Sequence, residues 1–553
     1  MKLTINGLAE RAKYEAAGVS VPSFDAATMQ QQGKENPRWV HIGPGNIFRI
    51  FLARIAHDMI ANGEFWPIAG VLPMQAEELD VQLAAHDLLT LGVTLNPDGS
   101  RDLDVIAGLS EAVATRREEG FARFVELMEA PSVTLCSFTV TEKGYAIHDS
   151  RGELQEAVRE AFEADPLAYH PHTMVLVAGA LYARFNAGAT PITMLSTDNF
   201  SHNGDKLRDS ILTIARGWEA AGSVPAEFVD YVADDTRVAF PISVIDKITP
   251  RPSEKIATDL AELGFTDMGL EAPFGTPLAG FVNGEPTEYL IIEDKFAAPR
   301  PPLEEYGAAI VDRQVCDDFE NMKVTTCLNP LHTALAISGT LLGYPTIDAE
   351  MRDGALAEMV RRLGYDEGLP VVTDPGIVAP ADFLREVLEV RFPNRFLPDQ
   401  PQRIAMDTSQ KLPIRYGETI KKYIDRGLNL DDLEVIPLVF ALWARYLMGV
   451  ADDGAPMAMP SDPLLEELME LLSGVALGGA DEEGTDDATE TPDAPRATDV
   501  DVHAALEPLL SNPTIFGVNL YETPLAAKAE ALFARMITKP GAVRATLNEE
   551  MNA

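Results

Sequence analysis

The sequence predicts an α/β protein whose N-terminal part holds a mostly parallel sheet and whose C-terminal part is mainly α-helical. Two observations support this fold class. Short β-rich runs alternate with amphipathic helical stretches through the first half of the 553-residue chain, and such runs become scarce after about Pro301. Regular alternation of strands and helices is typical of βαβ units, whose strands lie parallel in one sheet.

The predicted strands are short apolar runs rich in β-branched residues. Runs of this length without polar alternation are typical of strands that are covered on both faces. The five clearest runs are Trp39–Gly43, Pro67–Leu72, Ser132–Val140, Ile192–Asn199 and Tyr289–Asp294. Between the second and the third run, Ser110–Ala130 has the character of a helix.

Apolar residues after Pro301 recur with helical rather than strand spacing. The four longest helical patterns are Leu331–Tyr344, Gly354–Tyr365, Ala381–Phe392 and Leu433–Val450. We therefore predict a domain boundary near residue 295, with an α/β domain over residues 1–295 and a mainly helical domain over residues 296–553.

The charge of the chain excludes some classes of partner. The chain has 44 Lys and Arg against 86 Asp and Glu, a formal net charge of −42, whereas nucleic acids and anionic membrane surfaces favour positive patches. Residues 478–501 combine many acidic side chains with almost no large apolar ones. A segment of this composition cannot bury enough apolar surface to offset its ordering entropy, so we predict that it is disordered.

Several locations and kinds of site are also disfavoured. The chain has neither a run of about 18 apolar residues nor a signal-peptide pattern, so we expect a cytoplasmic protein without a membrane partner. Its three cysteines have neither disulfide nor zinc spacing, and its nine histidines do not cluster as metal ligands. We therefore expect no metal. His170 and His172 are interpreted as part of a surface loop.

A glycine turn follows the first predicted strand. Gly43 and Gly45 stand between that strand and a helical pattern, an arrangement that lets a backbone approach a dinucleotide pyrophosphate at a helix N-terminus. Phe48 occupies the place of the third glycine in the common fingerprint. We interpret residues 1–295 as a Rossmann-type dinucleotide-binding domain, with a tight turn that binds nothing as the alternative.

Three polar residues stand at the start of a strongly apolar helical pattern in the C-terminal half. Asn329 and Pro330 form a helix start signal, and we expect Asn329 at the N-cap and Pro330 at the first helical position. His332 follows on the same helix face, and Lys323 lies before the helix. Each residue alone is open to an ordinary structural explanation. Three groups that are costly to bury, placed together, predict a chemical site.

Six segments with distinctive residues occur along the chain in a fixed order. They are GPGNIFR at Gly43–Arg49, TVTEKGY at Thr139–Tyr145, STDNFSHNG at Ser196–Gly204, SVIDKITP at Ser243–Pro250, IIEDKF at Ile291–Phe296 and DTSQKLP at Asp407–Pro413. Together they resemble the signatures of the polyol-specific long-chain dehydrogenases. This family includes mannitol 2-dehydrogenase, fructuronate reductase and tagaturonate reductase.

The resemblance implies hydride transfer between a nicotinamide and a ketose or polyol carbon, without a metal. It implies that Lys323 is the general acid/base and that Glu320 assists proton exchange. Asn199 and Asn329 would donate hydrogen bonds to the developing oxyanion, and His332 would hold a neighbouring substrate hydroxyl. Cofactor contacts are implied for Gly43, Gly45, Asn46, Arg49, Thr141 and Glu142.

One departure from the family concerns the spacing before the apolar helix. Five residues separate Lys323 from Asn329, where the family usually has four. We expect a local bulge to absorb the extra residue.

The expected partner is a small sugar or sugar acid. Asp246, Lys247 and Lys411 belong to the matching blocks, and the two lysines are spare cations for a substrate carboxylate. We therefore favour D-fructuronate and D-mannonate over fructose and mannitol, with solvated surface charge as the alternative role of the lysines.

The cofactor and the activity itself each have an alternative. No acidic residue directly follows the second predicted strand, but no basic residue is close to it either, so we favour NAD while NADP stays open. A cofactor-binding protein that has lost catalysis is the remaining alternative to an enzyme.

Overall fold

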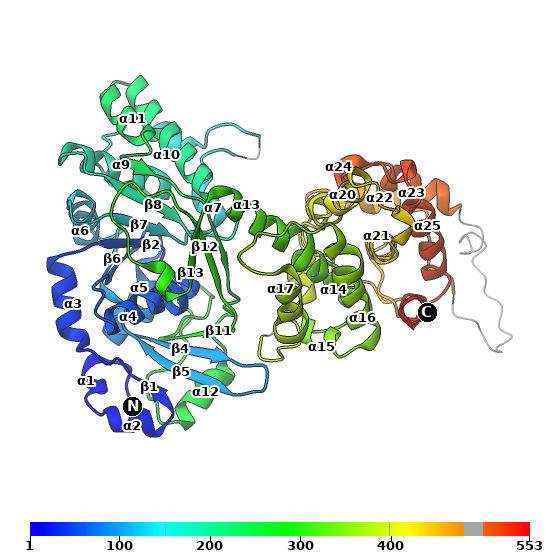
Figure 1. The fold of residues 1–553 in the computed structure, drawn as a ribbon, viewed down its shortest axis with the longest axis horizontal. Coiled ribbons are helices and arrows are strands. Elements are labelled where there is room, and N and C mark those ends of the chain that lie inside the picture. Colours follow the sequence, from blue (N-terminus) through cyan, green and yellow to red (C-terminus); the bar gives the residue numbers. More distant parts are fainter. Residues whose placement is uncertain (150, 398, 480–500, 553) are drawn as a thin grey trace. The chain divides into compact units, whose positions relative to one another are not determined.

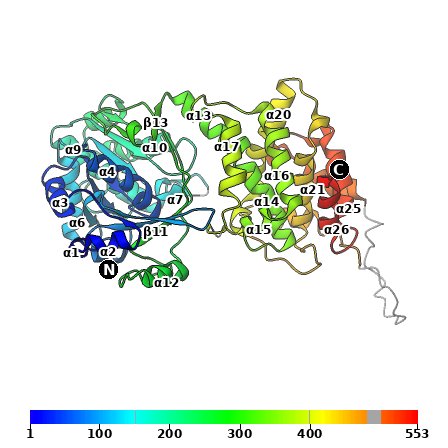
Figure 2. The ribbon, with the colours of Figure 1, turned by 60° about the horizontal axis from the view of Figure 1, so that its bottom comes forward.

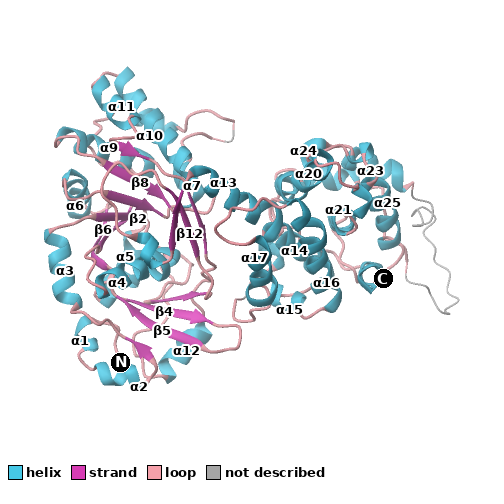
Figure 3. Ribbon diagram, in the orientation of Figure 1, coloured by secondary structure: helices cyan, strands magenta, loops and turns pink. Residues whose placement is uncertain are grey.

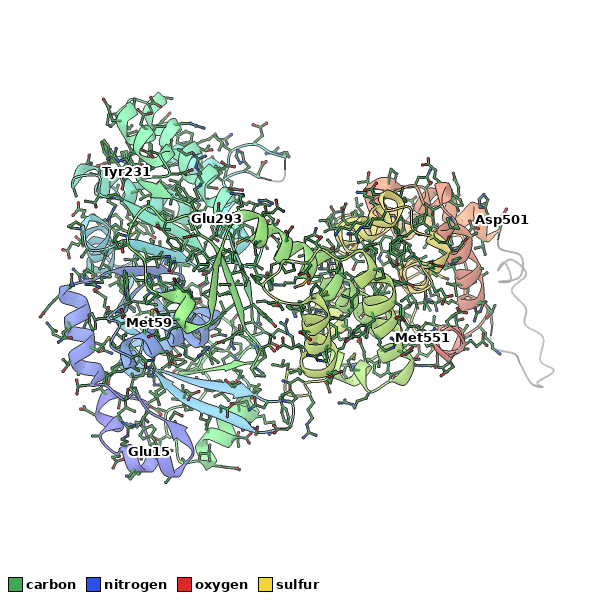
Figure 4. All side chains as sticks on the ribbon, in the orientation of Figure 1. Glu15, Met59, Tyr231, Glu293, Asp501 and Met551 are labelled. Atoms are coloured by element: carbon green, nitrogen blue, oxygen red, sulfur yellow. The ribbon has the colours of Figure 1, made fainter. Side chains whose placement is uncertain are left out.

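The computed structural model describes residues 1–149, 151–397, 399–479 and 501–552. The chain forms two compact units, Met1–Cys316 and Asp317–Ala553. Most of the acidic segment predicted to be disordered, residues 480–500, lies outside the described residues. The described chain resumes at Asp501, whose side chain caps the helix that follows (Figure 4).

The first unit is built on a six-stranded sheet in which every strand pairing is parallel (Figure 1). Its strand order is β6-β3-β2-β7-β8-β9. Numbered from the first strand of this sheet, that is the 3-2-1-4-5-6 order of doubly wound dinucleotide-binding folds. The strands are β2 (Trp39–Ile42), β3 (Ile68–Leu72), β6 (Leu109–Ala114), β7 (Leu135–Phe138), β8 (Ile192–Ser196) and β9 (Val238–Ala239).

One strand of this sheet corrects the sequence interpretation. The stretch Ser110–Ala130 was predicted to be helical, but its first residues belong to β6, and helix α6 covers only Glu118–Glu129. β6 lies beside β3, where its backbone groups complete a parallel ladder. Tertiary pairing therefore overrides the weak strand propensity of this segment.

Helices cover both faces of the sheet (Figure 3). Val40 and Ile42 of β2 face a core that contains side chains of α6, α9 (Thr173–Asn186) and α10 (Asn203–Ala220). Trp39, which precedes Val40, faces a second core with α4 (Ala53–Ala61). Burial on both faces explains why these strands are apolar throughout.

Two smaller sheets complete the first unit. One has the order β1-β5-β4-β11, and the other has the order β10-β12-β13. β13 follows residue 295 and pairs with β12, which explains why the first compact unit extends to Cys316. The strands are β1 (Val19–Ser20), β4 (Thr90–Leu95), β5 (Arg101–Ile106), β11 (Phe281–Gly284), β10 (Ser243–Asp246), β12 (Tyr289–Glu293) and β13 (Ala308–Val311).

The regular elements in the described part of the second unit are helices (Figures 2 and 3). Their centre is formed by α14 (Asn329–Leu342) and α21 (Val435–Leu447), both almost entirely buried. α16 (Gly354–Arg362), α17 (Pro380–Glu386) and α25 (Leu525–Met536) lie around them. The predicted fold class is confirmed. No helix in the described ranges is long and apolar enough to cross a membrane.

Candidate active site

The glycine turn after β2 has room for a ligand at its backbone. Gly43 has φ of +86°, and a Cβ there would lie 2.3 Å from the carbonyl oxygen of Thr139, so only glycine is tolerated. A Cβ on Gly45 would meet nothing closer than 3.9 Å. The turn is therefore tight against the protein on one side and open on the other, as a pyrophosphate-binding turn requires.

A series of hydrogen bonds between buried side chains ends at the backbone carbonyl of Gly43 and so holds this turn in place. Trp39 donates its indole N–H to Ser137 Oγ at 2.7 Å, and Ser137 Oγ lies 2.7 Å from His41 Nδ1. His41 Nε2 lies 2.9 Å from Thr139 Oγ1, which donates to the carbonyl of Gly43 at 2.6 Å. The Ser137 hydroxyl accepts from Trp39 and therefore donates to His41 Nδ1, whereas the Thr139 hydroxyl donates to Gly43 and therefore accepts from His41 Nε2. His41 thus carries its proton on Nε2. Burial lowers the pKa of His41 to about 3, so the ring stays neutral.

Phe48, in the place of the third fingerprint glycine, packs on the same histidine. Its ring stacks on His41 with centroids 3.9 Å apart, and it opens a π-helical turn, Phe48–Leu52. The bulky residue is therefore accommodated by a locally widened helix rather than by close helix–strand packing.

Arg49, which the resemblance assigns to the cofactor, lies in the protein interior and does not line the cavity beside the glycine turn. Its guanidinium donates to Thr90 Oγ1 at 3.2 Å and to the carbonyl of Ala279 at 3.0 Å. Through these contacts Arg49 holds the helical turn after the glycines against the sheet that contains β4 and β11.

The segment after β7 is held in place by one carboxylate. Asp198 accepts hydrogen bonds from the backbone N–H groups of Val140 and Thr141, each at 2.9 Å, and from the Tyr145 hydroxyl at 2.6 Å. Thr141 has φ of +64°, a left-handed conformation that is unusual for a β-branched residue. The acidic residue of the Asp-Asn stretch thus shapes the predicted cofactor loop from the end of the neighbouring strand.

A cavity of about 500 Å³ opens where the glycine turn, the end of β3 and the segment after β7 meet. Gly43, Gly45 and Thr141, for which cofactor contacts are predicted, line it. The lining further includes Leu72, Pro73, Met74, Gln75, Glu78, Thr139, Val140, Lys143, Gly144, Gln155, Pro171, His172 and Thr173. This is the crevice at the carboxyl ends of the strands where doubly wound folds bind nucleotides.

The positions of His172 and Glu142 near this cavity differ from those predicted, whereas Asn46 lies beside the glycine turn as its sequence position requires. His172, interpreted as surface loop, lines the cavity, and its Nε2 donates to the carbonyl of Ala146 at 3.1 Å. Glu142 does not line the cavity and instead pairs with Lys206 at 3.1 Å on the surface. Asn46 directly follows the glycine turn, and its Oδ1 is buried without a hydrogen-bond partner among the described residues.

Asn199 also belongs to the first unit. It follows β8 directly after Asp198, at the same edge of the sheet as the glycine turn, and it is exposed. This placement at the carboxyl end of a parallel strand leaves Asn199 accessible for a role in binding.

In the second unit, the expected bulge lies between Lys323 and Asn329. Lys323 is 3% exposed and begins a π-helical turn, Lys323–Cys327. The N–H of Leu328 donates to the carbonyl of Lys323 at 3.1 Å, a hydrogen bond that spans five residues. A π-turn holds one residue more than an α-turn, so it absorbs the extra residue that the sequence shows. Glu320 lies one turn earlier, on α13 (Arg313–Met322).

The helix start differs from the prediction by one residue. The N-cap of α14 is Leu328, and Asn329 and Pro330 are the first two helical residues. No side chain caps the helix. The reason is that α14 continues from the π-turn instead of beginning from extended chain, so the predicted N-cap position of Asn329 is wrong. Asn329 nevertheless stays at the mouth of the buried helix.

Charged groups surround His332 on α14. His332 Nε2 lies 3.2 Å from Asp399, which also pairs with Arg403 at 2.5 Å. Burial lowers the pKa of His332, and the hydrogen bond to Asp399 opposes that effect. On the next position of the helix, Thr333 Oγ1 accepts a hydrogen bond from Arg415.

The two predicted substrate lysines have different surroundings. Lys247, in the first unit, is almost fully buried, and its ammonium donates to the carbonyl of Glu285 at 2.7 Å and to Glu288 at 3.0 Å. These partners occupy its ammonium, so Lys247 is neither a spare cation for a substrate carboxylate nor a solvated surface charge. The preceding Asp246 is also buried, at the end of β10.

Lys411, in the second unit, is partly buried, and its ammonium donates to the carbonyls of Ile404 and Met406. Burial, together with nearby Arg415, lowers the pKa of Lys411 to about 8. Burial also lowers the pKa of Arg415 to about 10. Lys411 and Arg415 are therefore two cations whose desolvation favours an added anion.

A doubly wound α/β unit with an open glycine turn, followed by a helical unit with a buried lysine before a polar helix mouth, defines a class of two-domain nicotinamide-dependent oxidoreductases. The chain belongs to the mannitol dehydrogenase family. The model of the mannitol dehydrogenase Rossmann domain matches residues 37–305, and the model of the mannitol dehydrogenase C-terminal domain matches residues 316–482.

Individual relatives extend this likeness over the whole chain. The D-mannonate oxidoreductase of Thermotoga maritima is 45% identical over 99% of this chain and 99% of its own length. A mannitol 2-dehydrogenase of Cereibacter sphaeroides is 32% identical over 80% of this chain and 86% of its own length. The solved mannitol 2-dehydrogenase of Pseudomonas fluorescens, a ternary complex with NAD and D-mannitol, covers 100% of both chains with a TM-score of 0.71 and 26% identity. The predicted family and oxidoreductase class are confirmed.

Proposed function

We propose that the chain is an NAD-dependent oxidoreductase that interconverts D-mannonate and D-fructuronate. The observation that carries this proposal is the likeness to D-mannonate oxidoreductase, which extends over 99% of both chains at 45% identity. The mannitol 2-dehydrogenase relative is less similar, at 32% identity. Mannitol and fructose therefore form the second candidate pair.

The first unit supplies the cofactor site in this proposal. Gly45 leaves its backbone open to the cavity, and Gly43 and Thr141 shape the walls on either side. When bound, NAD accepts the hydride that leaves the carbinol carbon. The chain contributes the binding surface, and Asp198 and His41 keep the two cofactor segments in shape through the hydrogen bonds described above.

The second unit supplies the proton chemistry. Oxidation of an alcohol requires a base for the hydroxyl proton, and the same group returns that proton to the oxygen during reduction. Lys323 is the proposed base because it is buried at the mouth of α14, close in sequence to Asn329. Asn329 keeps its implied role as an amide donor to the oxygen, and His332, oriented by Asp399, is the donor or acceptor for a neighbouring hydroxyl.

A substrate carboxylate distinguishes mannonate from mannitol. Lys411 and Arg415 are partly desolvated cations of the second unit, and Arg403 pairs with Asp399 in the same region. Lys411 and Arg415 are the proposed carboxylate partners, because a charged hydrogen bond in a desolvated site is stronger than one to a neutral hydroxyl. Lys247 has no part in this site, since Glu288 and Glu285 hold its ammonium.

The test is a substrate panel followed by nicotinamide absorbance. D-mannonate and D-mannitol are offered with NAD, and D-fructuronate and D-fructose are offered with NADH. The proposal expects kcat/KM for the sugar acids to exceed that for the neutral sugars by at least about tenfold. A preference for mannitol and fructose would establish the second candidate, and NADH binding without turnover of any substrate would show a non-catalytic protein.

A further inference from the structure

One continuous helical run of the second unit carries a row of hydrogen-bond donors. Tyr416, Thr419 and Lys422 follow one another at three-residue spacing, which places their side chains on one side of a helix. The same run, residues 408–425, carries Lys411 and Arg415, the proposed carboxylate partners. It consists of α19 (Thr408–Leu412), a π-helical turn, Pro413–Gly417, and α20 (Glu418–Asp425).

The first two donors hold the chain that follows the buried Lys323. The Tyr416 hydroxyl donates to the carbonyl of Pro330 at 2.6 Å, in the first turn of α14. The Thr419 hydroxyl donates to the carbonyl of Thr325 at 3.3 Å, inside the π-turn that begins at Lys323. Both acceptors are backbone groups, so these hydrogen bonds fix the path of the chain itself.

The third donor, Lys422, holds the chain that precedes Lys323. Its ammonium donates to Asn321 Oδ1 at 2.8 Å and to Thr373 Oγ1 at 3.0 Å. Thr373 Oγ1 in turn donates to Asn321 Oδ1 at 2.8 Å, and Thr325 Oγ1 donates to the Asn321 carbonyl at 2.7 Å. Asn321 is therefore the point where the π-turn, Thr373 and α20 meet.

The ammonium of Lys422 is committed to this contact. Lys422 is partly buried, and in the ranges that the structure describes no carboxylate lies within ion-pair distance of it. The neighbouring Lys421, in contrast, pairs with Glu418 at 2.8 Å and has a side chain that is 42% exposed. A charged donor makes a stronger hydrogen bond than a neutral one, and partial exclusion of water strengthens it further. Lys422 thus binds Asn321 rather than a counter-ion.

We propose that Lys422 is a positioning residue that acts through the Asn321 side chain and holds the π-turn of Lys323 in its working geometry. The inference rests on the proposed role of Lys323 as the acid/base and deepens it. A π-turn is a rare helical form, and the contacts of Asn321 keep it from relaxing to the α-helical register. Proton transfer needs the base within hydrogen-bond reach of the substrate hydroxyl, and a displacement of about 1 Å costs about 100-fold in rate.

Two variants remove the contact from either side. Lys422→Met keeps the apolar stem and removes the ammonium, and Asn321→Leu keeps the approximate size and removes the acceptor. Each should lower kcat by about 10- to 100-fold, measured with NAD and the alcohol preferred in the substrate panel. KM for that alcohol and NADH affinity should change by less than about threefold, because neither residue belongs to the proposed binding sites. The double variant should be no slower than the slower single variant, since both changes remove the same contact.

Two further variants are matched controls. Asn321→Asp keeps the acceptor oxygen for Lys422 and Thr373, and Lys421→Met removes the same charge from the next position of α20. Both should keep kcat within about threefold of the wild type. Wild-type kcat in Lys422→Met, or an equal loss in Lys421→Met, would overturn the assignment. A loss of kcat with an equal loss of NADH binding would also overturn it, because it would show general destabilisation.

A milder variant decides the matter if Lys422→Met and Asn321→Leu do not fold. Thr373→Val keeps the shape of the side chain and removes one donor to Asn321 and one acceptor for Lys422. It should lower kcat by about three- to tenfold with unchanged NADH affinity. An unchanged kcat would contradict the proposal.

Lys323→Ala, measured alongside, separates failure of this inference from failure of the proposed function. If Lys323→Ala turns over normally, Lys323 is not the acid/base, and both proposals fail. If Lys323→Ala loses turnover while Lys422→Met and Asn321→Leu keep the wild-type kcat, the acid/base stands and only the role of Lys422 is wrong.

Discussion

Lys323 is the residue on which the proposed chemistry most depends, because it is buried at the mouth of α14. Lys323→Ala should retain NADH affinity and lower turnover by about 10²- to 10⁴-fold, the range for loss of a positioned acid/base. Stopped-flow turnover and NADH fluorescence titration measure the two effects separately. Partial recovery of turnover with small external amines would support the same role. Normal turnover of the variant would contradict it.

We expect a substitution of Glu350, on α15 (Ile347–Met351), to change the stability of the protein rather than its activity. Glu350 is 0% exposed, and neither carboxylate oxygen has a hydrogen-bond partner in the described ranges. Its carboxyl packs against the backbone of α14 at Gly339, where a Cβ would lie 1.7 Å from Oε1. Burial, reinforced by Asp399, raises the pKa of Glu350 from 4.5 to about 10.

The sign of the resulting pH dependence follows from linkage. The pKa of Glu350 in the folded state lies above its unfolded value of 4.5. Its stabilising contribution to the free energy of unfolding is therefore complete below about pH 4.5 and is lost as the pH rises toward 10. The loss is about 1.4 kcal/mol per pH unit in the free energy of unfolding. Glu350→Gln should remove this slope and raise the thermal midpoint at pH 8. Exposed Glu389→Gln is the control, and an unchanged slope in Glu350→Gln would refute the interpretation.

At the scale of elements, the end of β8 controls the loop after β7. Asp198→Asn keeps the size of the side chain but exchanges one acceptor oxygen for a donor nitrogen that faces backbone N–H groups of Val140 or Thr141. We expect NADH affinity to fall by about tenfold, because the left-handed turn at Thr141 loses its charged partner. Fluorescence titration measures the effect. Asp209→Asn, an exposed change on α10, should leave the affinity unaltered, and equal losses in both variants would argue against the loop mechanism.

The observed helices and strands also show which elements can be predicted from local sequence patterns. The five predicted strands are present as β2, β3, β7, β8 and β12. The sequence predicts a helix from Ser110 onward, because the residues of β6 (Leu109–Ala114) are no more typical of a strand than of a helix, and it is their pairing with β3 that makes them a strand. Residue spacing alone predicts a local bulge between Lys323 and Asn329, which the structure forms as the π-turn Lys323–Cys327, whereas the position of the N-cap depends on the chain that precedes it.

At the scale of the whole molecule, the net charge of −42 should make stability depend on salt. Self-repulsion of a strongly acidic chain disfavours the compact state, and added salt screens it. We expect the thermal midpoint at pH 8 to rise between about 0.02 and 0.5 M NaCl, where the Debye length falls from roughly 20 to 4 Å. Differential scanning fluorimetry at fixed pH measures this change. A flat or falling midpoint would show that local ion pairs outweigh the net charge.

The sequence by itself determined the succession of strands and helices, the glycine turn and the polar mouth of the apolar helix, because periodicity, turn residues and motif spacing are local properties of the chain. Tertiary structure decided which side chains are free to act. It buried Arg49 in the core, paired Lys247 with Glu288, and brought Glu78 to the cavity wall. Burial and partners depend on residues far away in the sequence, so no local pattern could have supplied them.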